Sequence, residues 1–238
     1  MSANKKYGYS IPFSNEGKKA LKFLESLKKN INLKKDIVVC LVDKKTSNLT
    51  KLILRDYIKK NKNFNLLDIR SKNFTETRIK GLKNLKSRNC HFFFDLDGNG
   101  SHDPKFIIKF KREIENFHLD AVFGTRFKNY KKSYLGKKNI SRILLSFLGH
   151  KIANFFLSAS FSDTGGYVCM NRYSVMKIIK NKFYSPAHFF HYELKYLLKN
   201  TNYKEISISY KKSPSKISFN AIINALKSLC ILFFLRFK

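Results

Sequence analysis

The sequence has little cysteine and proline, no tryptophan and few acidic residues. Its four cysteines, Cys40, Cys90, Cys169 and Cys230, lie far apart with no C-x-x-C pair. They therefore indicate buried thiols in a reducing compartment, not a disulfide framework or a zinc site. The N-terminal stretch has no apolar core of the secretory type, so we expect no signal peptide. The longest strongly apolar run, Leu229–Leu235, is far below the roughly 20 residues of a membrane-spanning helix.

The scarcity of acidic residues leaves a large positive charge. The 238 residues carry 48 Lys and Arg against 16 Asp and Glu, which gives a formal net charge of +32. This charge either reflects the Lys-, Asn- and Ile-rich output of an AT-rich coding sequence or serves an anionic partner. Such a partner is nucleic acid, an anionic membrane surface or a phosphorylated substrate. With 43% hydrophobic residues, the chain is not a disordered basic tail and can bury the core of one domain.

Short apolar runs alternate with stretches of roughly 3.6-residue periodicity. The runs predict strands over Tyr7–Pro12, Asp36–Val42, Asn65–Ile69, His91–Leu96, Ala121–Gly124, Tyr167–Met170 and Glu205–Tyr210. The periodic stretches predict helices over Glu16–Asn30, Leu49–Lys60, Thr75–Lys86, Pro104–Phe117, Ile140–Leu157, Arg172–Ile179, Ala187–Lys199 and Phe219–Leu235. This alternation predicts an α/β fold with a mostly parallel sheet that is covered by helices on both faces.

Polar and glycine-rich clusters follow several of the predicted strands. They are Ser14-Asn15-Glu16-Gly17, Asp43, Asp97-Gly98-Asn99-Gly100 and Gly124-Thr125-Arg126. Ligands of open α/β sheets bind outside the carboxyl ends of the strands. The sequence therefore predicts the functional site at this edge of the sheet.

The segment from Phe92 to Pro104 carries the strongest chemical signal. A buried strand runs into closely spaced carboxylates, a glycine-containing loop, and a proline where a helix begins. Two oxygen ligands at positions i and i+2 can share one hard divalent cation, whose other positions are filled by water and diphosphate oxygens. Such a cation would neutralise a departing nucleotide diphosphate. The alternatives are a plain acidic turn or an EF-hand, and the EF-hand is disfavoured because loop position 12, counted from Asp97, is Ile108.

At this point the chain resembles the family-2 glycosyltransferases of the GT-A fold, and within them the polyprenyl-phosphate (dolichol-phosphate) mannose synthase-like branch. The resemblance covers roughly residues 7–218 and rests on seven segments in the family's order. They are Ile11–Glu16 (I-P-x-x-N-E), Val42-Asp43 (V-D-D), Asp97–Pro104 (D-x-D-G-x-H-D-P), Asp120–Arg126 (D-V-V-x-G-S-R), Asp163–Tyr167 (D-x-x-S-G-F), Phe190–Leu194 (F-x-x-E-L) and Ser213–Lys216 (G-x-S-K). Lys44 replaces the second Asp of V-D-D, Asn99 replaces the second carboxylate of D-x-D, and the segment at Asp163 is one residue short.

The resemblance implies a set of site residues and Mg²⁺ or Mn²⁺ as cofactor. It implies that Pro12, Asn15 and Glu16 line the nucleotide pocket, that Asp43 holds the base or ribose, that Asp97 and Asn99 hold the metal, and that Arg126 and Lys216 bind phosphates. A second register pairs Asp95 with Asp97 instead of Asn99. Asp163 is either a general base for an acceptor hydroxyl or a residue that orients Arg and Lys side chains. His188 and His191 share a helix face but have no third ligand nearby, so we predict no zinc site.

Two helices are apolar enough to meet a membrane. They are Ile140–Leu157 and the C-terminal Phe219–Leu235, and basic residues flank both of them. The alternative is that each apolar stripe faces the protein core. We therefore divide the chain into a GT-A domain over residues 1–218 and a C-terminal amphipathic or apolar helix over residues 219–238.

These observations predict a glycosyltransferase of the cell envelope, cytoplasmic and peripheral at the inner face of the membrane. It would move a sugar from GDP-mannose or a UDP-glucose-like donor to a polyprenyl phosphate, with inversion. One alternative is transfer to a sugar hydroxyl or glycan in surface-polysaccharide assembly, which would require Asp163 as base. Another is a degenerate, non-catalytic module, motivated by Lys44 and Asn99. A nucleic-acid partner is unlikely on sequence grounds, because no recognition helix or RNP-type aromatic motif is present.

Overall fold

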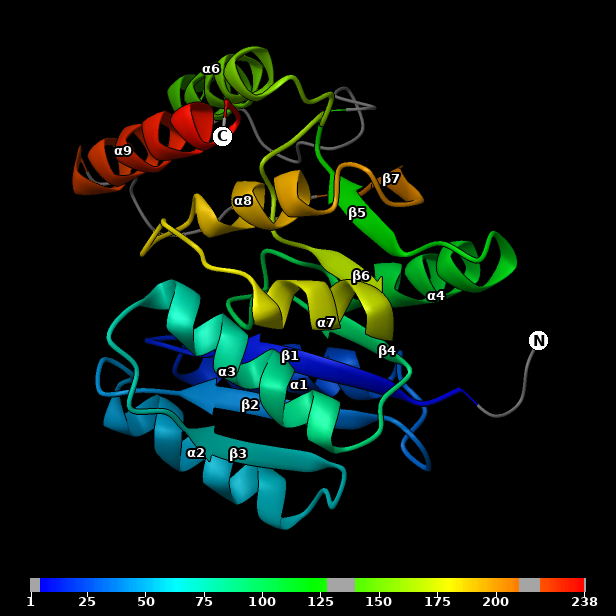
Figure 1. The fold of residues 1–238 in the computed structure, drawn as a ribbon. Coiled ribbons are helices and arrows are strands. Elements are labelled where there is room, and N and C mark those ends of the chain that lie inside the picture. Colours follow the sequence, from blue (N-terminus) through cyan, green and yellow to red (C-terminus); the bar gives the residue numbers. More distant parts are fainter. Residues whose placement is uncertain (1–4, 128–139, 210–218, 238) are drawn as a thin grey trace.

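The computed structural model describes residues 5–127, 140–209 and 219–237. Its seven-stranded sheet has the order β3-β2-β1-β4-β6-β5-β7 (Figure 1). The strands are β1 (Tyr7–Pro12), β2 (Ile37–Val42), β3 (Phe64–Asp68), β4 (Phe92–Asp95), β5 (Ala121–Thr125), β6 (Val168–Asn171) and β7 (Tyr203–Ser207). Each lies within three residues of its predicted position, and the α/β architecture with a mostly parallel sheet is confirmed.

One strand runs against the others. β6 pairs antiparallel with both β4 and β5, whereas the remaining pairs are parallel. Val168, at the start of β6, lies opposite Asp95 at the end of β4. Because β6 starts at the edge where the parallel strands end, the residues that precede it, including Asp163, reach the functional edge of the sheet.

Helices cover both faces of the sheet (Figure 1). They are α1 (Lys18–Lys28), α2 (Asn48–Lys59), α3 (Phe74–Ser87), α4 (Ile107–Asn116, preceded by a 3₁₀ turn over Pro104–Phe106), α6 (Ile140–Leu157), α7 (Arg172–Lys180), α8 (Phe190–Leu197) and α9 (Phe219–Leu235). Side chains of Ser47, Asn73 and Asn171 accept backbone N–H groups and so cap α2, α3 and α7. The predicted ends of α6 and α9 coincide with the observed ones.

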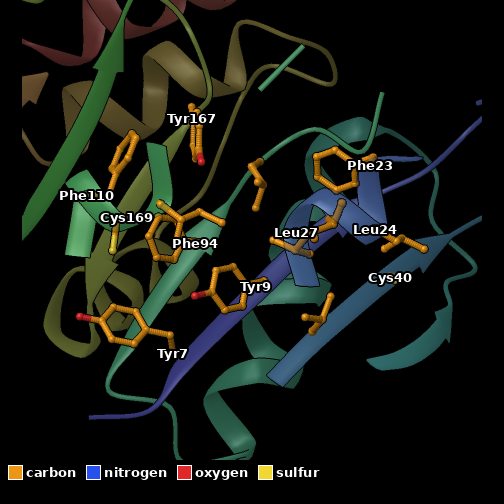
Figure 2. Close-up of a cluster of buried hydrophobic side chains, with 14 of the residues drawn as sticks. Tyr7, Tyr9, Phe23, Leu24, Leu27, Cys40, Phe94, Phe110, Tyr167 and Cys169 are labelled. Atoms are coloured by element: carbon orange, nitrogen blue, oxygen red, sulfur yellow. The ribbon is translucent and has the colours of Figure 1, made fainter. Parts of the chain in front are cut away.

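The core lies in two layers. Side chains of α1, α2 and α4 pack on one face of the sheet, and those of α3, α7 and α8 pack on the other. Figure 2 shows the first layer, in which Tyr9 of β1 stacks on Phe94 of β4, with ring centroids 5.0 Å apart. Phe110 of α4 stacks on Tyr167 at 4.5 Å. This aromatic layer fixes β1, β4 and the start of β6 together beneath the functional edge.

The cysteines follow the prediction with one correction. Cys40, Cys90 and Cys169 are buried free thiols, but Cys230 is a free thiol that is exposed on α9. The expectation that all four are buried was wrong, because α9 buries only Ser228 and Leu229 among its residues.

A glycine brings α3 close to the sheet. A Cβ atom at Gly81 would lie 2.4 Å from the hydroxyl oxygen of Ser10 and 2.6 Å from a methyl carbon of Leu41. Only glycine permits this approach of α3 to β1 and β2. The short separation carries Arg78, one turn earlier in α3, to the end of β4.

The helices α6 and α9 lie side by side at one end of the domain (Figure 1). Phe156 and Phe233 form an edge contact at 5.6 Å, and Arg236 donates to the carbonyl oxygen of Phe156 at 3.1 Å. The C-terminal helix therefore packs on the domain. Within the ranges that the structure describes, no helix has the length and hydropathy required to cross a bilayer.

Candidate functional site

A buried arginine holds the two strand-end carboxylates. Arg78 of α3 is 1% exposed and donates to Asp95 at 2.6 Å and, through its other terminal nitrogen, to Asp97. A bidentate guanidinium fork suits two carboxylates that are held side by side. Asp95 is fully buried, whereas the Asp97 side chain is 24% exposed. Asp97 is therefore the accessible carboxylate of this pair and the one that a ligand could contact.

The surroundings of Asp95 and Asp97 shift the pKa values of these two carboxyl groups in opposite directions. Burial raises the pKa of Asp95 to about 6, against the opposing effect of Arg78. Burial also raises the pKa of Asp97, but His102, which is cationic in acid, and Arg78 outweigh it and hold that pKa well below its usual range. Asp97 is thus a permanently ionised carboxylate at neutral pH.

The loop after Asp97 is fixed by its own side chains. His102 accepts the Asp97 backbone N–H at Nδ1 (2.9 Å) and stacks on Tyr167 at 4.9 Å. Burial lowers the pKa of His102 to about 4, so the ring is neutral at pH 7. Asn99 accepts the Ser101 N–H at 2.9 Å, and Gly100 adopts a φ of +80° that favours glycine. The loop therefore presents Asp97 and Asn99 from a defined turn.

The predicted nucleotide-pocket residues lie at the same edge. The carbonyl of Pro12 accepts the Gly98 N–H at 3.3 Å, which ties the end of β1 to the Asp97 loop. Asp43 accepts the backbone N–H groups of Lys45 (2.8 Å) and Thr46 (3.1 Å). Burial raises the pKa of Glu16 against the lowering effect of the Ser14 N–H that it accepts, and the charge of Asp97 raises it further. Asn15 is exposed.

A second ion pair joins Arg126 to Asp163. The Asp163 carboxylate is fully buried and accepts the Arg126 backbone N–H (2.9 Å), Nε–H (2.7 Å) and a terminal N–H, as well as the Gly165 N–H (3.0 Å). Although burial raises the pKa of Asp163, Arg126 and Lys195 outweigh this effect and lower it to about 2. Arg126 also donates to the hydroxyl of Ser146 in α6 at 2.9 Å. The geometry thus favours Asp163 as the residue that orients Arg126.

A buried lysine binds the backbone next to this ion pair. Lys195 of α8 is 1% exposed and donates to the backbone carbonyl of Asp163 at 2.6 Å, and its Nζ lies 3.9 Å from a Glu205 carboxylate oxygen. Glu205 in turn accepts the Ser162 N–H at 3.0 Å. The backbone at Ser162 and Asp163 is therefore held by two charged groups, which fixes it beside Arg126.

Glu193, in the F-x-x-E-L segment, has a local role. Its two carboxylate oxygens accept the backbone N–H groups of Tyr184 (2.8 Å) and Ser185 (2.7 Å). Thr75 of α3 donates to the Ser185 carbonyl, so this clamp joins α8 to the start of α3. The carboxylate of Glu193 therefore binds the loop before α8 at Tyr184 and Ser185.

Asp97 and Asn99 are the side chains that could bind a divalent cation at this edge of the sheet. The described residues contain no group of three or more His, Cys, Asp or Glu side chains that could hold a metal ion. They do offer an ionised Asp97 with one oxygen beyond the Arg78 contact, and an Asn99 carbonyl oxygen with a second lone pair. Mg²⁺ is commonly bound through one or two protein oxygens plus phosphates and water. These residues therefore fit a cation that is shared with a diphosphate.

The structure brings most of the predicted residues to one edge, and it adds others. Asp95, Asp97, Asn99, Arg126, Asp163, Pro12, Glu16 and Asp43 lie there, and Lys216 lies outside the described residues. Arg78 and Lys195 were not predicted. Arg78 occupies the buried stripe of α3 with Leu82 and Leu85, and Lys195 lies in the buried run of α8. A basic residue in an apolar helical stripe is the sequence signal that could have found them.

Comparisons with known proteins agree with this geometry. The family model Glycosyl transferase family 2 matches residues 10–179. The uncharacterized protein MJ0544 of Methanocaldococcus jannaschii is 37% identical over 120 residues, 49% of this chain and 50% of that protein. The matched segment therefore spans about half the length of this curated relative.

Two solved structures share the fold. The S. aureus TarS fragment 1-349 in complex with UDP-GlcNAc has a TM-score of 0.61 at 13% identity, covering 96% of this chain and 66% of that one. Glucosyl-3-phosphoglycerate synthase from Mycobacterium tuberculosis, in complex with Mn²⁺, UDP and phosphoglyceric acid, has a TM-score of 0.63 at 10% identity. It covers 99% of this chain and 79% of that one. At these identities the likeness shows the GT-A fold.

Proposed function

The chain belongs to glycosyl transferase family 2, and we propose that it moves a sugar from a nucleotide-diphosphate sugar to a polyprenyl phosphate at a membrane surface. The donor is of the GDP-mannose or UDP-glucose type. Support comes from the strand edge that joins Pro12, Glu16 and Asp43 to the Asp97 loop, and from relatives of this fold that bind UDP or UDP-GlcNAc. The polyprenyl-phosphate mannose synthase-like branch remains part of this proposal.

The state of Asp163 is the observation that carries the acceptor class. A hydroxyl acceptor needs a base, and Asp163 is fully buried, accepts four N–H groups and has a pKa of about 2. A phosphate monoester needs little base help, because its second pKa is about 6. A phosphate oxygen can attack the sugar carbon in line and invert it, while Arg126 stabilises the phosphate charge.

Asp97 and Asn99 are the residues that would hold Mg²⁺ or Mn²⁺ in this proposal. When bound, the cation would neutralise the charge of the departing diphosphate. Arg78 keeps Asp97 in place and ionised, which is the contribution of the protein to that site. Asp95 serves as the second buried partner of Arg78.

The membrane is the proposed source of the acceptor. The paired helices α6 and α9 expose large apolar side chains, including Phe155 (80%), Phe219 (75%) and Phe234 (68%). Net charge of +32 complements anionic lipid headgroups. We propose a peripheral position at the cytoplasmic face of the membrane, in cell-envelope assembly.

The competing function is transfer to a sugar hydroxyl. The TarS and glucosyl-3-phosphoglycerate synthase relatives share only the fold with this chain, and so they do not decide between acceptors. A non-catalytic module is a further competitor because Lys44 and Asn99 depart from the family pattern. Lys44 is exposed, so it need not block the pocket.

A matched pair of acceptors tests the proposal. The full chain is incubated with UDP- and GDP-hexoses, Mg²⁺ or Mn²⁺, and either polyprenyl phosphate or the corresponding polyprenol. We expect product only with the phosphate, and a loss of roughly 100-fold in Asp97→Asn. Asp56→Asn, at an exposed carboxylate in the last turns of α2, serves as control and keeps wild-type activity.

Two results would overturn the proposal. Transfer to a glycan hydroxyl but not to polyprenyl phosphate would favour the competing transferase. Absence of a thermal shift with every nucleotide diphosphate and nucleotide sugar, with and without Mn²⁺, would favour the non-catalytic module, since a ligand at 100 times its Kd stabilises by about 2.7 kcal/mol.

A further inference from the structure

His191 of α8 lies under the Gly165-Gly166 turn. A Cβ atom at Gly166 would come within 2.3 to 2.5 Å of three atoms of the His191 ring, so the backbone of the turn rests on the imidazole. Phe74 of α3 contacts the ring from the other side in a perpendicular arrangement, with 5.4 Å between the ring centroids. His191 is 7% exposed and belongs to none of the contacts assigned above.

The His191 ring differs from the neighbouring buried polar side chains of α8 in its hydrogen bonding. Tyr192 donates to Asn154 (2.7 Å), Glu193 accepts from Ser185 (2.7 Å), and Lys195 donates to Asp163 (2.6 Å). His191 Nδ1 is buried and has no hydrogen-bond partner among the residues that the structure describes. Buried polar side-chain atoms in native proteins are nearly always hydrogen-bonded, so an orphan at the edge of a ligand site points to a ligand atom.

The charges around His191 indicate which ligand chemistry suits it. Arg78, Asp97, His188 and His102 are the groups that act on it electrostatically. Burial, reinforced by Arg78, lowers the pKa of His191 well below its usual value, so the ring is neutral at physiological pH. A neutral imidazole carries one N–H donor. It can therefore hold an anionic oxygen beside Arg78 without adding a further buried charge.

We propose that His191 Nδ1 donates a hydrogen bond to a phosphate oxygen held between the Asp97 loop and the Gly165-Gly166 turn. The inference rests on the proposed function for the source of that phosphate, which is either the donor diphosphate or the acceptor monophosphate. His191 is then a binding residue of the transferase site. The carboxylate of Asp163 already accepts four N–H groups, whereas Nδ1 of His191 has no hydrogen-bond partner among the described residues and can bind the ligand.

Three substitutions separate this role from packing. The side-chain amide of His191→Asn places an N–H donor near the position of Nδ1, His191→Gln places it near Nε2, and His191→Phe keeps an aromatic ring without a donor. Binding of pyrophosphate, UDP and GDP is measured by calorimetry, and the KM for polyprenyl phosphate is measured in the transfer assay. His118→Asn, at an exposed histidine, is the control.

We expect His191→Phe and His191→Gln to lose about tenfold in phosphate affinity, and His191→Asn to stay within about threefold of wild type. Weaker binding of pyrophosphate and nucleotides assigns the contact to the donor. Unchanged nucleotide binding with a raised KM for polyprenyl phosphate assigns it to the acceptor. Should His191→Phe fail to fold, the Asn and Gln pair still gives the comparison.

The inference is wrong if all folded variants bind pyrophosphate and nucleotides and use polyprenyl phosphate as wild type does. It is also wrong if the variants lose only kcat toward a hydroxyl acceptor, because His191 would then act as a base. A result that contradicts the proposed function can be distinguished from a result that contradicts the role of His191. Pyrophosphate binding that depends on His191, without any sugar transfer by wild type, would retain the contact and reject the transferase.

Discussion

At the scale of single residues, the candidate site is built from buried ion pairs. Arg78 spans Asp95 and Asp97, and Asp163 takes three donors from Arg126. Breaking a buried ion pair by removing one partner costs about 3–5 kcal/mol, because the remaining charge is left uncompensated. These pairs therefore fix the positions of Asp97 and Arg126, which are the groups that would face the ligands in the proposed function.

The acidity of Asp163 leads to a prediction about stability and pH. Its folded-state pKa of about 2 lies below the unfolded value near 4, so its contribution is present above pH 4 and is lost as pH falls toward 2. That contribution is about 2 kcal/mol. We expect Asp163→Asn to be less stable than wild type by at least this amount at pH 7, with a gap that narrows between pH 4 and pH 2.

Urea unfolding of wild type and Asp163→Asn from about pH 7 to about pH 2 measures the difference between their free energies of unfolding. Asp68→Asn, on the exposed edge of the sheet, is the control and should differ little from wild type at any pH. A gap that is constant with pH would mean that the carboxylate charge of Asp163 contributes nothing, and that Arg126 is held in another way.

At the scale of elements, α6 connects the apolar surface to the site. The same helix exposes Leu144, Phe147 and Leu148 and places the Ser146 hydroxyl 2.9 Å from Arg126. Phe127, which follows Arg126, stacks on His150 of α6 at 5.3 Å. A displacement of α6 would therefore reach Arg126 through two contacts.

This connection predicts a defect without unfolding. We expect Ser146→Ala to lower kcat/KM for the acceptor about fivefold, because Arg126 loses one of the bonds that orient it, while the free energy of unfolding falls by only about 1 kcal/mol, the usual net value of one hydrogen bond. Steady-state kinetics with polyprenyl phosphate and urea unfolding measure the two quantities. Ser228→Ala is the matched control, since within the described part of the chain that hydroxyl donates to the Asn224 carbonyl of its own helix and contacts no residue of the site. Equal kinetics in both variants would contradict the role of α6.

At the scale of the whole molecule, apolar exposure is concentrated where α6 and α9 meet, at the end of the domain away from β3 (Figure 1). The two helices contact one another through Phe156 and Phe233 and leave Phe155 and Phe234 outside. Aromatic side chains that enter the interfacial region of a bilayer contribute to binding in proportion to the apolar area that they bury. In the proposed function, the pair of helices would therefore form one surface that meets lipid.

The combined variant Phe155→Ser/Phe234→Ser tests this surface. Because a fully buried Phe is worth about 1.5–3 kcal/mol, we expect its affinity for anionic liposomes to fall at least tenfold. Leu52→Ser, at an exposed apolar position on α2 (57%), is the control and should cosediment as wild type does. Unchanged cosedimentation of the double variant would assign the apolar pair to another role.

The sequence by itself determined the order of the elements and the family, and it predicted the strand edge at which the candidate residues gather. Strand and helix periodicities and the loop from Asp97 to Pro104 depend on neighbours within a few residues, so they can be read along the chain. The ends of α6 and α9 were predicted for the same reason. The antiparallel direction of β6 was missed, because it depends on where the chain returns after a segment of more than 40 residues.

Only the tertiary structure decided how the charges are paired. Arg78, 17 residues before Asp95, and Lys195, 32 residues after Asp163, reach their partners because helices lie across the sheet. The sequence left Asp163 open between a base and an orienting residue, and burial with four donors favours the second role. Hydrogen-bond saturation and desolvation are properties of the packed interior, which no local pattern contains.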